Sequence, residues 1–399
     1  MKVVVTGLGI VSSVGQSVQA AWSNITAGVS GIKPVAVPYR VSKTTATGHI
    51  PDFVLSSQFD RRWPNKTDRH VQLALNAVQQ AIEHSGLDLA STDPSRVHTV
   101  IGTCAGGYDS IAKNIQRITS GDPSLPNFIP GHINNMMSAY VNMHYGIQGS
   151  GLCVAGACAA GNQSIAVGSM LIETGQADVV IAGASDSWLH DVVVSGFESL
   201  GALSFDPVLP RPFDAARTGF AISEGAGIVV LESESHARRR GADILAQLSG
   251  YSISSDAYHP TSPEPSNQVL IRTVNQALAK AKIDGFQVNY INMHATGTKI
   301  GDAVECQGMQ QVFGSRPFLS STKSMTGHSI GSSSAIEAVI SILCIKHGAV
   351  PGTANLDNVD PECPGNHVIS TLETTVDHVL SNSFGFGGTN GVLLFSRFD

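Results

Sequence analysis

Cys158 is the residue whose surroundings most favour chemistry. Small residues flank it, Ala157 and Ala159, so that a substrate could approach its sulfur. The pattern predicts a short apolar strand leading in through Gly156 and a helix leading out to about Glu173. At such a strand-to-helix turn, backbone N–H groups and the helix dipole favour a thiolate, much as a serine elbow presents its hydroxyl. A free cysteine between small residues is also a common packed residue, and these residues alone leave both interpretations open.

Two histidines and one lysine stand in comparable places. His294 ends the apolar strand predicted at 290–293, and His328 lies in a loop five residues after Lys323. Functional side chains of open α/β sheets gather just past the ends of strands. Neither histidine has a second histidine or a carboxylate four residues on, so the local spacing predicts no metal site. Taken alone, Lys323 is better interpreted as a solvated loop residue.

A glycine-rich run at 382–391 exposes its backbone for binding. Its Phe384 and Phe386 indicate an apolar wall or gate and argue against a phosphate cradle. Gly7 and Gly9 follow the first predicted strand, but the third glycine of a dinucleotide-binding loop is missing.

Predicted strands and helices, which could position these residues, alternate along the chain, and this alternation predicts an α/β fold. Short β-branched runs predict strands at 2–6, 97–101, 177–184 and 227–231, and apolar periodicity predicts helices at 68–85, 267–282 and 332–346. The order of elements is similar in residues 1–240, which carry the cysteine, and 241–399, which carry both histidines. We therefore expect two related halves.

The composition fits a large buried core. The chain has 399 residues, of which 42% are hydrophobic and 14% charged, and its net charge of −7 argues against a nucleic-acid-binding surface. No apolar run approaches the ~18 residues of a membrane span. Six scattered cysteines without a CxxC pair predict neither a zinc site nor a disulfide scaffold. With no recognisable signal peptide, we expect a cytoplasmic protein.

Four motifs together resemble a known family. Gly-Ala-Cys158-Ala-Ala-Gly, Asn-Met-His294-Ala-Thr-Gly-Thr, Lys323-Ser-Met-Thr-Gly-His328 and Asn-Ser-Phe-Gly-Phe386-Gly-Gly-Thr-Asn are similar, in this order, to motifs of the elongating β-ketoacyl-acyl-carrier-protein synthases of the synthase II type. The resemblance spans essentially the whole chain and extends to ketosynthase subunits of type II polyketide synthases. It implies a thiolase fold, with duplicated α-β-α-β-α layers and two mixed five-stranded sheets, acting as a dimer.

The resemblance also implies a decarboxylative Claisen condensation between a cysteine-bound acyl chain and a malonyl-acyl-carrier protein, without cofactor or metal. Cys158 would carry the acyl group, and His294 and His328 would stabilise the enolate formed as CO₂ leaves. The amides of Cys158 and Phe386 would form the oxyanion hole, with Phe386 as a gate. Lys323 would balance the local charge. Which histidine acts on the malonyl carboxylate stays open.

Further positions follow from the same resemblance. Substrate contacts are expected from Thr296, Thr298, Ala105, Phe197, Phe384 and Gly387. A structural role near the site is expected from Glu337. Docking of the acidic acyl carrier protein is expected at Arg61, Arg62, Lys66 and Arg69.

The chain departs from the family at two places. His294-Ala-Thr-Gly-Thr298 replaces the usual His-Gly-Thr-Ser-Thr, and Ala105 stands where many fatty-acid enzymes carry a bulkier aliphatic residue. A smaller residue predicts a wider acyl tunnel that admits longer or stiffer chains. These departures favour a specialised polyketide or polyene pathway over primary fatty-acid elongation without deciding between them.

Two other classes of protein are disfavoured by the residues present. A thiolase acting on coenzyme A would need a second cysteine in 382–391, which is absent. A non-catalytic chain-length factor would lack the nucleophile, which is present. An active ketosynthase subunit could still pair with such a factor, so homodimer and heterodimer both remain open.

Overall fold

The computed structural model describes residues 1–35, 42–44, 46–204 and 209–398. Its first half contributes five strands to the main sheet: β1 (Val3–Ser12), β4 (Val97–Gly102), β5 (Gly151–Leu152), β6 (Val179–Ser187) and β7 (Glu224–Ser233). The second half contributes β8 (Ala246–Ser255), β9 (Tyr290–Asn292), β10 (Phe318–Ser320), β14 (His378–Gly385), β15 (Thr389–Ser396) and the short β12 (Asn366–His367).

The two halves share one topology. The order is β5-β4-β6-β7-β1 in the first half and β10-β9-β14-β15-β8 in the second, with β12 added at the edge. In each half the first three strands are parallel and the last two pairings are antiparallel. Three residue pairs between β1 and β8 join the halves, so that hydrogen bonding is continuous over eleven strands. The two expected five-stranded sheets are thus joined along one edge, and the duplication seen only in outline from the sequence is present strand for strand.

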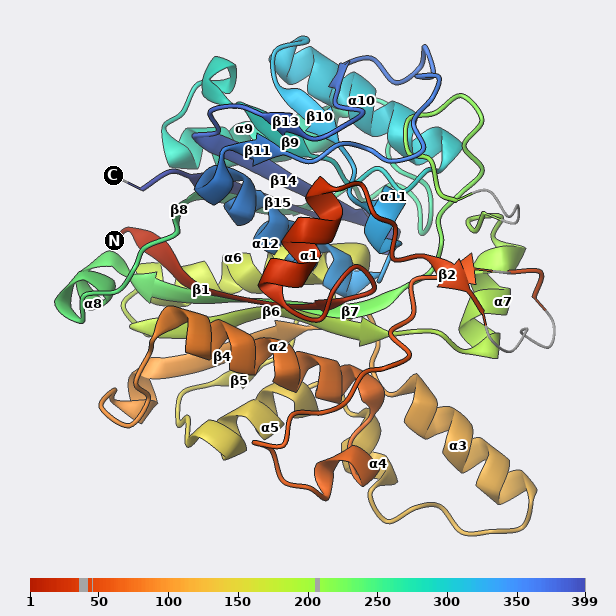
Figure 1. Ribbon diagram of the computed structural model, residues 1–399, viewed down its shortest axis with the longest axis vertical. Coiled ribbons are helices and arrows are strands. Elements are labelled where there is room, and N and C mark those ends of the chain that lie inside the picture. Colours follow the sequence, from red (N-terminus) through yellow and green to blue (C-terminus); the bar gives the residue numbers. More distant parts are fainter. Residues whose placement is uncertain (36–41, 45, 205–208, 399) are drawn as a thin grey trace.

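Helices complete the layers (Figure 1). Two central helices, α6 (Ala160–Glu173) and α12 (Gly331–His347), contact strands of both halves. The outer face of the first half is covered by α2 (Arg69–Ser85), and that of the second by α9 (Gln268–Ala281), which also contacts α10 (Lys299–Phe313). The result is the layered α-β-α-β-α arrangement expected of a thiolase fold.

The other elements lie around this core. The remaining helices are α1 (Val18–Thr26), α3 (Tyr108–Thr119), α4 (Phe128–His132), α5 (Met136–Tyr145), α7 (Asp191–Ser199), α8 (Glu234–Arg239) and α11 (Lys323–Thr326). Two small sheets pair β2 (Lys33–Pro34) with β3 (Ala46–Thr47) and β11 (Ala349–Val350) with β13 (Leu372–Glu373). Among the described residues, no helix combines the length and apolar character that crossing a bilayer requires.

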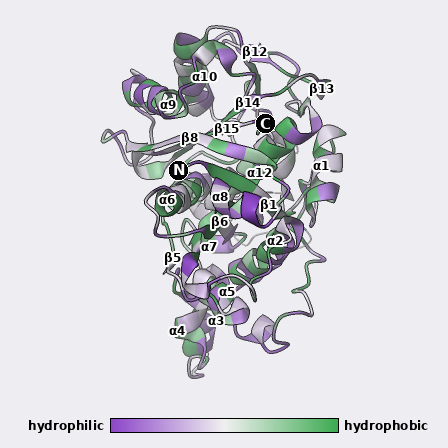
Figure 2. Ribbon diagram, turned by 90° about the vertical axis from the view of Figure 1, so that its left-hand side faces the viewer, coloured by the Kyte–Doolittle hydropathy of each residue, from purple (hydrophilic) through white to green (hydrophobic). Residues whose placement is uncertain are grey.

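Local sequence explains the close packing of the centre. Residues 331–345 of α12 are all buried, and Figure 2 shows this helix beside β8 and β15. Its first turns are rich in serine and alanine, which lets α6 approach closely. A Cβ at Gly161 of α6 would lie 2.4 Å from the backbone nitrogen of Ala335, so only glycine fits this crossing. This crossing brings the cysteine segment of the first half against the histidine segment of the second.

Three element boundaries differ from the sequence expectation. The strand predicted at 2–6 continues to Ser12, because α2 packs directly on its glycines: a Cβ at Gly9 would lie 1.8 Å from the carbonyl oxygen of Ala77. The strand predicted to lead into the cysteine is only the two-residue β5, and an irregular segment follows it to Gly156. The helix predicted from residue 68 begins at Arg69, with Asp68 as its N-cap.

Candidate active site

Cys158 sits on a sharp turn, as predicted. It lies in the 3₁₀ turn η3 (Ala157–Ala159), directly before α6. The preceding residue, Ala157, has a φ of 48°, a left-handed conformation that is uncommon for a residue with a side chain. Backbone strain of this kind is held in place by surrounding structure and is frequent at functional sites. Here it turns the chain so that the sulfur faces a cavity that Cys158 helps to line.

The electrostatics of Cys158 differ from the sequence expectation. The residue is only 9% exposed, and this burial raises the pKa of its thiol to about 12. The charge of Lys323 and the backbone N–H groups of Phe386 and Cys158 lower the pKa, but less than burial raises it. The resting sulfur is therefore a thiol, not the thiolate that the helix N-terminus led us to expect. The two N–H groups beside the sulfur are the pair expected to form the oxyanion hole.

His328 is the group that can take the proton of this thiol. Its Nε2 lies 3.2 Å from Sγ of Cys158. Its Nδ1 lies 3.0 Å from Oγ of Ser333, a hydroxyl that also accepts the backbone N–H of Ser329. Burial, followed by the charge of Lys323, holds the pKa of His328 well below its usual value, so the ring is neutral. A neutral imidazole in contact with a thiol is suited to general-base catalysis.

His294 faces the same cavity from the end of β9. Its ring centroid lies 5.6 Å from that of His328, nearly perpendicular to it. Burial and the charge of Lys323 also hold its pKa well below the usual value. The backbone N–H groups of His294 and Ala295 donate to the two oxygens of Glu305, each at 2.8 Å. Glu305, in the second turn of α10, thus fixes the loop that carries His294.

Lys323 and Glu337 form a buried ion pair beside these groups. Each is about 1% exposed, and Nζ of Lys323 donates to Oε1 of Glu337. The pairing satisfies two charges that would be costly to bury alone. The lysine acts on Cys158 and on both histidines through its charge, not through contact. Both predicted positions therefore lie at the site.

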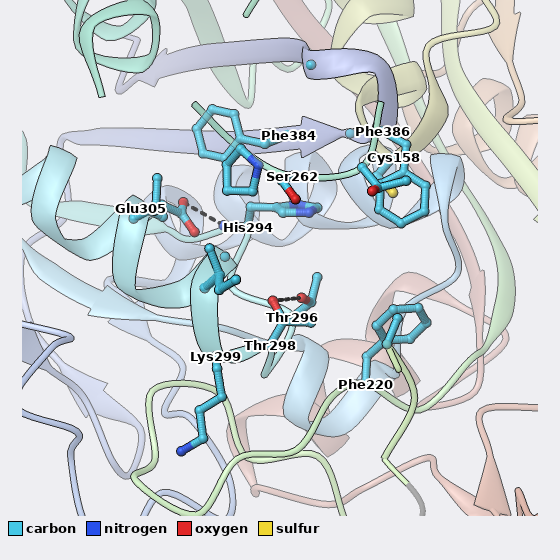
Figure 3. Close-up of a pocket in the computed structure, with 18 of the residues that line it drawn as sticks. Cys158, Phe220, Ser262, His294, Thr296, Thr298, Lys299, Glu305, Phe384 and Phe386 are labelled. Atoms are coloured by element: carbon cyan, nitrogen blue, oxygen red, sulfur yellow. Dashed lines mark hydrogen bonds between the residues drawn. The ribbon is translucent and has the colours of Figure 1, made fainter. Parts of the chain in front are cut away.

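The cavity extends from the sulfur outward and has a volume of about 410 Å³. Thr296 and Thr298 line it side by side, with hydroxyl oxygens 3.2 Å apart (Figure 3). Phe384 and Phe386 line it on the strand side. A channel that joins two hydroxyls to an apolar wall fits an arm with amide groups and a methylene chain.

Of three other residues predicted to contact substrate, one lines the cavity and two do not. Phe197 lines the cavity and faces Phe386 with ring centroids 6.2 Å apart. Ala105 does not line this cavity; its carbonyl accepts the indole N–H of Trp188 at 2.7 Å, and Trp188 packs against Phe197. Gly387 does not line it either; it has a φ of 79° and donates its N–H to the carbonyl of Pro260.

The four basic residues predicted for docking are divided. Arg61, Arg62 and Lys66 line one surface hollow together, and Arg62 is paired with Asp60. Arg69 instead turns inward: its guanidinium bonds Glu224, which is 2% exposed, and also donates to the carbonyl of Ile50. A surface role is therefore left to the first three residues.

Sequence reasoning missed several residues of the site. Glu305 and Asp302, one helical turn apart on α10, hold the loop of residues 294–297 through its backbone N–H groups. Carboxylates three residues apart just after a functional loop were the available signal. Asp186 on β6 accepts the N–H groups of Cys104 and Ser332, and nothing in its local sequence indicates this role.

The folded chain brings three possible metal ligands close together. One donor atom each from Cys158, His294 and His328 lie within 4.8 Å of one another. These residues come from three separate segments of the chain, so the spacing between neighbours in the sequence could not reveal the cluster.

Comparison with known proteins agrees with this geometry. Residues 1–237 match the family model "Beta-ketoacyl synthase, N-terminal domain", and residues 245–357 match "Beta-ketoacyl synthase, C-terminal domain". The 3-oxoacyl-[acyl-carrier-protein] synthase 2 of Coxiella burnetii is 39% identical, over 99% of this chain and 98% of its own length. The enzyme of the same name from Synechocystis is 36% identical over 100% and 98%.

Solved structures of ketosynthases also match this chain over its full length. The ishigamide ketosynthase/chain length factor structure superimposes with a TM-score of 0.95 at 32% identity, covering 100% of this chain and 99% of the matched chain. A type II PKS acyl-carrier protein in complex with its ketosynthase bound to the hexaketide matches with a TM-score of 0.92 at 31% identity, over 100% and 99%.

Proposed function

This chain belongs to the β-ketoacyl synthase family, and from this premise we propose that it catalyses the decarboxylative Claisen condensation of a Cys158-bound acyl chain with a malonyl-acyl-carrier protein. The product is a 3-ketoacyl-carrier protein two carbons longer, with release of CO₂. The observation that carries the proposal is the contact between Sγ of Cys158 and Nε2 of His328 at 3.2 Å, with two backbone N–H groups at the sulfur.

The first half-reaction loads the cysteine. The Cys158 sulfur attacks the thioester carbonyl of the acyl carrier, and its proton passes to Nε2 of His328. The N–H groups of Cys158 and Phe386 stabilise the oxyanion of the tetrahedral intermediate. The bond to the pantetheine sulfur then breaks, and this sulfur takes the proton. A sulfur that starts as a thiol needs this base because burial disfavours the free thiolate.

The second half-reaction forms the new carbon–carbon bond. Loss of CO₂ from the malonyl group leaves its electron pair as an enolate, whose oxygen accepts hydrogen bonds from the N–H groups of His294 and His328. The hydroxyl of Ser333 can either accept from or donate to Nδ1 of His328, so it supports both tautomers that the two half-reactions need. The enolate carbon attacks the acyl carbon, the bond to Cys158 breaks, and the departing sulfur takes one proton, which is replaced from solvent.

The arm of the carrier would lie along the cavity, with Thr296 and Thr298 bonding its amide groups and Phe386 as the gate. Arg61, Arg62 and Lys66 would meet the acidic carrier protein. Reversing Lys66 to glutamate is then expected to weaken carrier binding, and added salt to weaken binding to the unmodified protein. Unchanged carrier affinity in both experiments would contradict this docking surface.

Incubation with acyl and malonyl carriers tests the reaction directly. We expect mass spectrometry to find the acyl group on the peptide containing Cys158, followed by CO₂ release and a product longer by two carbons. Cys158→Ala should lose acylation, whereas Cys153→Ser, a half-buried thiol outside the cavity, should retain it. Acylation elsewhere, or condensation in the Cys158→Ala variant, would contradict the proposal.

A second candidate is a ketosynthase subunit that works only with a chain-length-factor partner. The full-length match to a ketosynthase/chain length factor structure supports it. Condensation by the purified chain alone would exclude this dependence, and condensation only after adding such a partner would establish it. A boundary between the halves near residue 240 and a cytoplasmic location stay predictions.

A further inference from the structure

We infer that Cys158, His294 and His328 form a reversible binding site for a thiophilic cation of the Zn²⁺ class, and that an ion held there blocks the nucleophile. This use of the three residues is separate from acyl transfer. Their donor atoms lie within 4.8 Å of one another, and all three side chains line one cavity through which an ion can enter.

The geometry is close to that of a zinc site with an open position. Zinc binds a cysteine sulfur at about 2.3 Å and a histidine nitrogen at about 2.0 Å, which places these two ligands about 3.5 Å apart in a tetrahedron. The Sγ of Cys158 and Nε2 of His328 are already 3.2 Å apart. The donor atoms of the cluster are up to 4.8 Å apart, so His294 has to approach its co-ligands by up to about 1.5 Å. The fourth position faces the cavity and takes water or an anion.

The surroundings support the ligands. Ser333 fixes the ring of His328 through its Nδ1, which leaves Nε2 directed at the sulfur. A hydrogen bond to the second nitrogen is the usual support of a metal-binding histidine. Glu305 fixes the loop of His294 through backbone N–H groups. The nearby positive charge of Lys323 is compensated by its ion pair with Glu337.

One thiolate and two imidazoles select the kind of ion. These ligands favour Zn²⁺ and similar soft ions, whereas Mg²⁺ and Ca²⁺ prefer oxygen ligands. On binding, the Sγ–H bond of Cys158 breaks, its proton leaves to solvent and the sulfur keeps the electron pair for the metal. No redox step is involved. The bound sulfur can no longer attack a thioester.

Metal binding can be measured without any activity assay. The purified full-length chain is freed of metal with a chelator and titrated with Co²⁺. We expect one equivalent per chain, with a near-ultraviolet thiolate-to-cobalt charge-transfer band that Zn²⁺ removes and Mg²⁺ does not. Cys158→Ala should abolish the band, and His294→Ala should weaken binding at least tenfold. Cys153→Ser, the matched thiol control, should retain the band at one equivalent.

A second measurement needs no variant. Zn²⁺ should protect Cys158 from iodoacetamide in the unaltered protein, as followed by mass spectrometry of its peptide, and a chelator should restore alkylation. Alkylation unaffected by Zn²⁺, or a charge-transfer band that survives in Cys158→Ala, would overturn the inference.

Inhibition of acyl loading by Zn²⁺ is the one arm that rests on the proposed function. If the chain binds one Co²⁺ through Cys158 but transfers no acyl group, the proposed function fails and the metal site stands. If it transfers acyl groups at an unchanged rate with excess Zn²⁺ present, the metal site fails and the proposed function stands.

Discussion

Replacing Ser333 with alanine should slow the loading of Cys158 more than the decarboxylation of malonyl carrier. The variant removes the hydroxyl that lies 3.0 Å from Nδ1 of His328, a histidine that is only 1% exposed. A buried N–H left without an acceptor costs about 1–3 kcal/mol. The ring therefore shifts to the tautomer that carries its proton on Nε2, the nitrogen that must accept the proton of Cys158.

The size of the effect follows from this cost. At about 1.4 kcal/mol per tenfold change in rate, 1–3 kcal/mol corresponds to a loading rate lower by about 5- to 150-fold. Decarboxylation needs His328 as an N–H donor, which the surviving tautomer provides, so it should change by less than loading. Ser333 also accepts the backbone N–H of Ser329, so some loss of stability is expected in addition.

The assay compares the two half-reactions. Acylation of Cys158 is followed by rapid quenching and mass spectrometry, and CO₂ release from malonyl carrier is followed in the same preparation. Ser332→Ala is the matched control: this neighbouring buried serine bonds the carbonyl of Ser329, and neither histidine ring. Equal slowing of both half-reactions by Ser333→Ala would point to general damage to the site and refute the tautomer argument, as would an unchanged loading rate.

Three further predictions concern the tunnel, the fold and pH. Ala105→Ile should shorten the acyl chains accepted on Cys158, because the carbonyl of residue 105 bonds Trp188, which packs against the cavity-lining Phe197, and a larger residue there should narrow this end of the cavity; an unchanged chain-length profile in a competition assay would contradict it. Gly161→Ala should lower the free energy of unfolding by about 1–3 kcal/mol in denaturant titrations, because its Cβ meets the Ala335 backbone at 2.4 Å, whereas Gly196→Ala, with no atom within 4 Å, should not. Burial raises the pKa of Glu305 to about 7, so the folded protein holds the proton of this carboxyl group more tightly than the unfolded chain does. The stability that this proton contributes is therefore fully present below about pH 4.5 and is lost as the pH rises through about 7. The difference in unfolding free energy between pH 5 and pH 8 should therefore shrink in Glu305→Gln, and an equal difference in both proteins would refute this.

Sequence patterns predicted most of the framework because they reflect local physics. Apolar periodicity and a glycine stop placed α2 correctly to within one residue, and β-branched runs located β4 and β7. Errors occurred where tertiary packing decides. Nothing local says that β1 continues through Gly7 and Gly9, because these glycines serve the backbone of a helix some seventy residues away.

In the candidate site, too, local sequence predicted some residues and tertiary packing decided the place of others. The order of the motifs along the chain and their resemblance to a known family predicted Cys158, His294, His328 and Lys323 as site residues, although the local sequence of each left other interpretations open. Arg69 belonged to a basic cluster in sequence, yet its guanidinium turns inward to a buried carboxylate. Glu305 was missed because its partners, two backbone N–H groups and the side-chain amide of Asn382, meet it only in the folded chain, and the spacing of the carboxylates on α10 was the one local signal.

By itself, the sequence determined most of the elements and the family to which the chain belongs, and it predicted which residues carry chemistry, because propensity, periodicity and motif are properties of neighbouring residues. Only the tertiary structure decided that Cys158 rests as a thiol and that three donors from distant segments meet within 4.8 Å. The close crossing of α6 and α12 places Cys158 beside His328, and the loop after β9 brings His294 to the same cavity, so both results depend on segments that are far apart in the sequence.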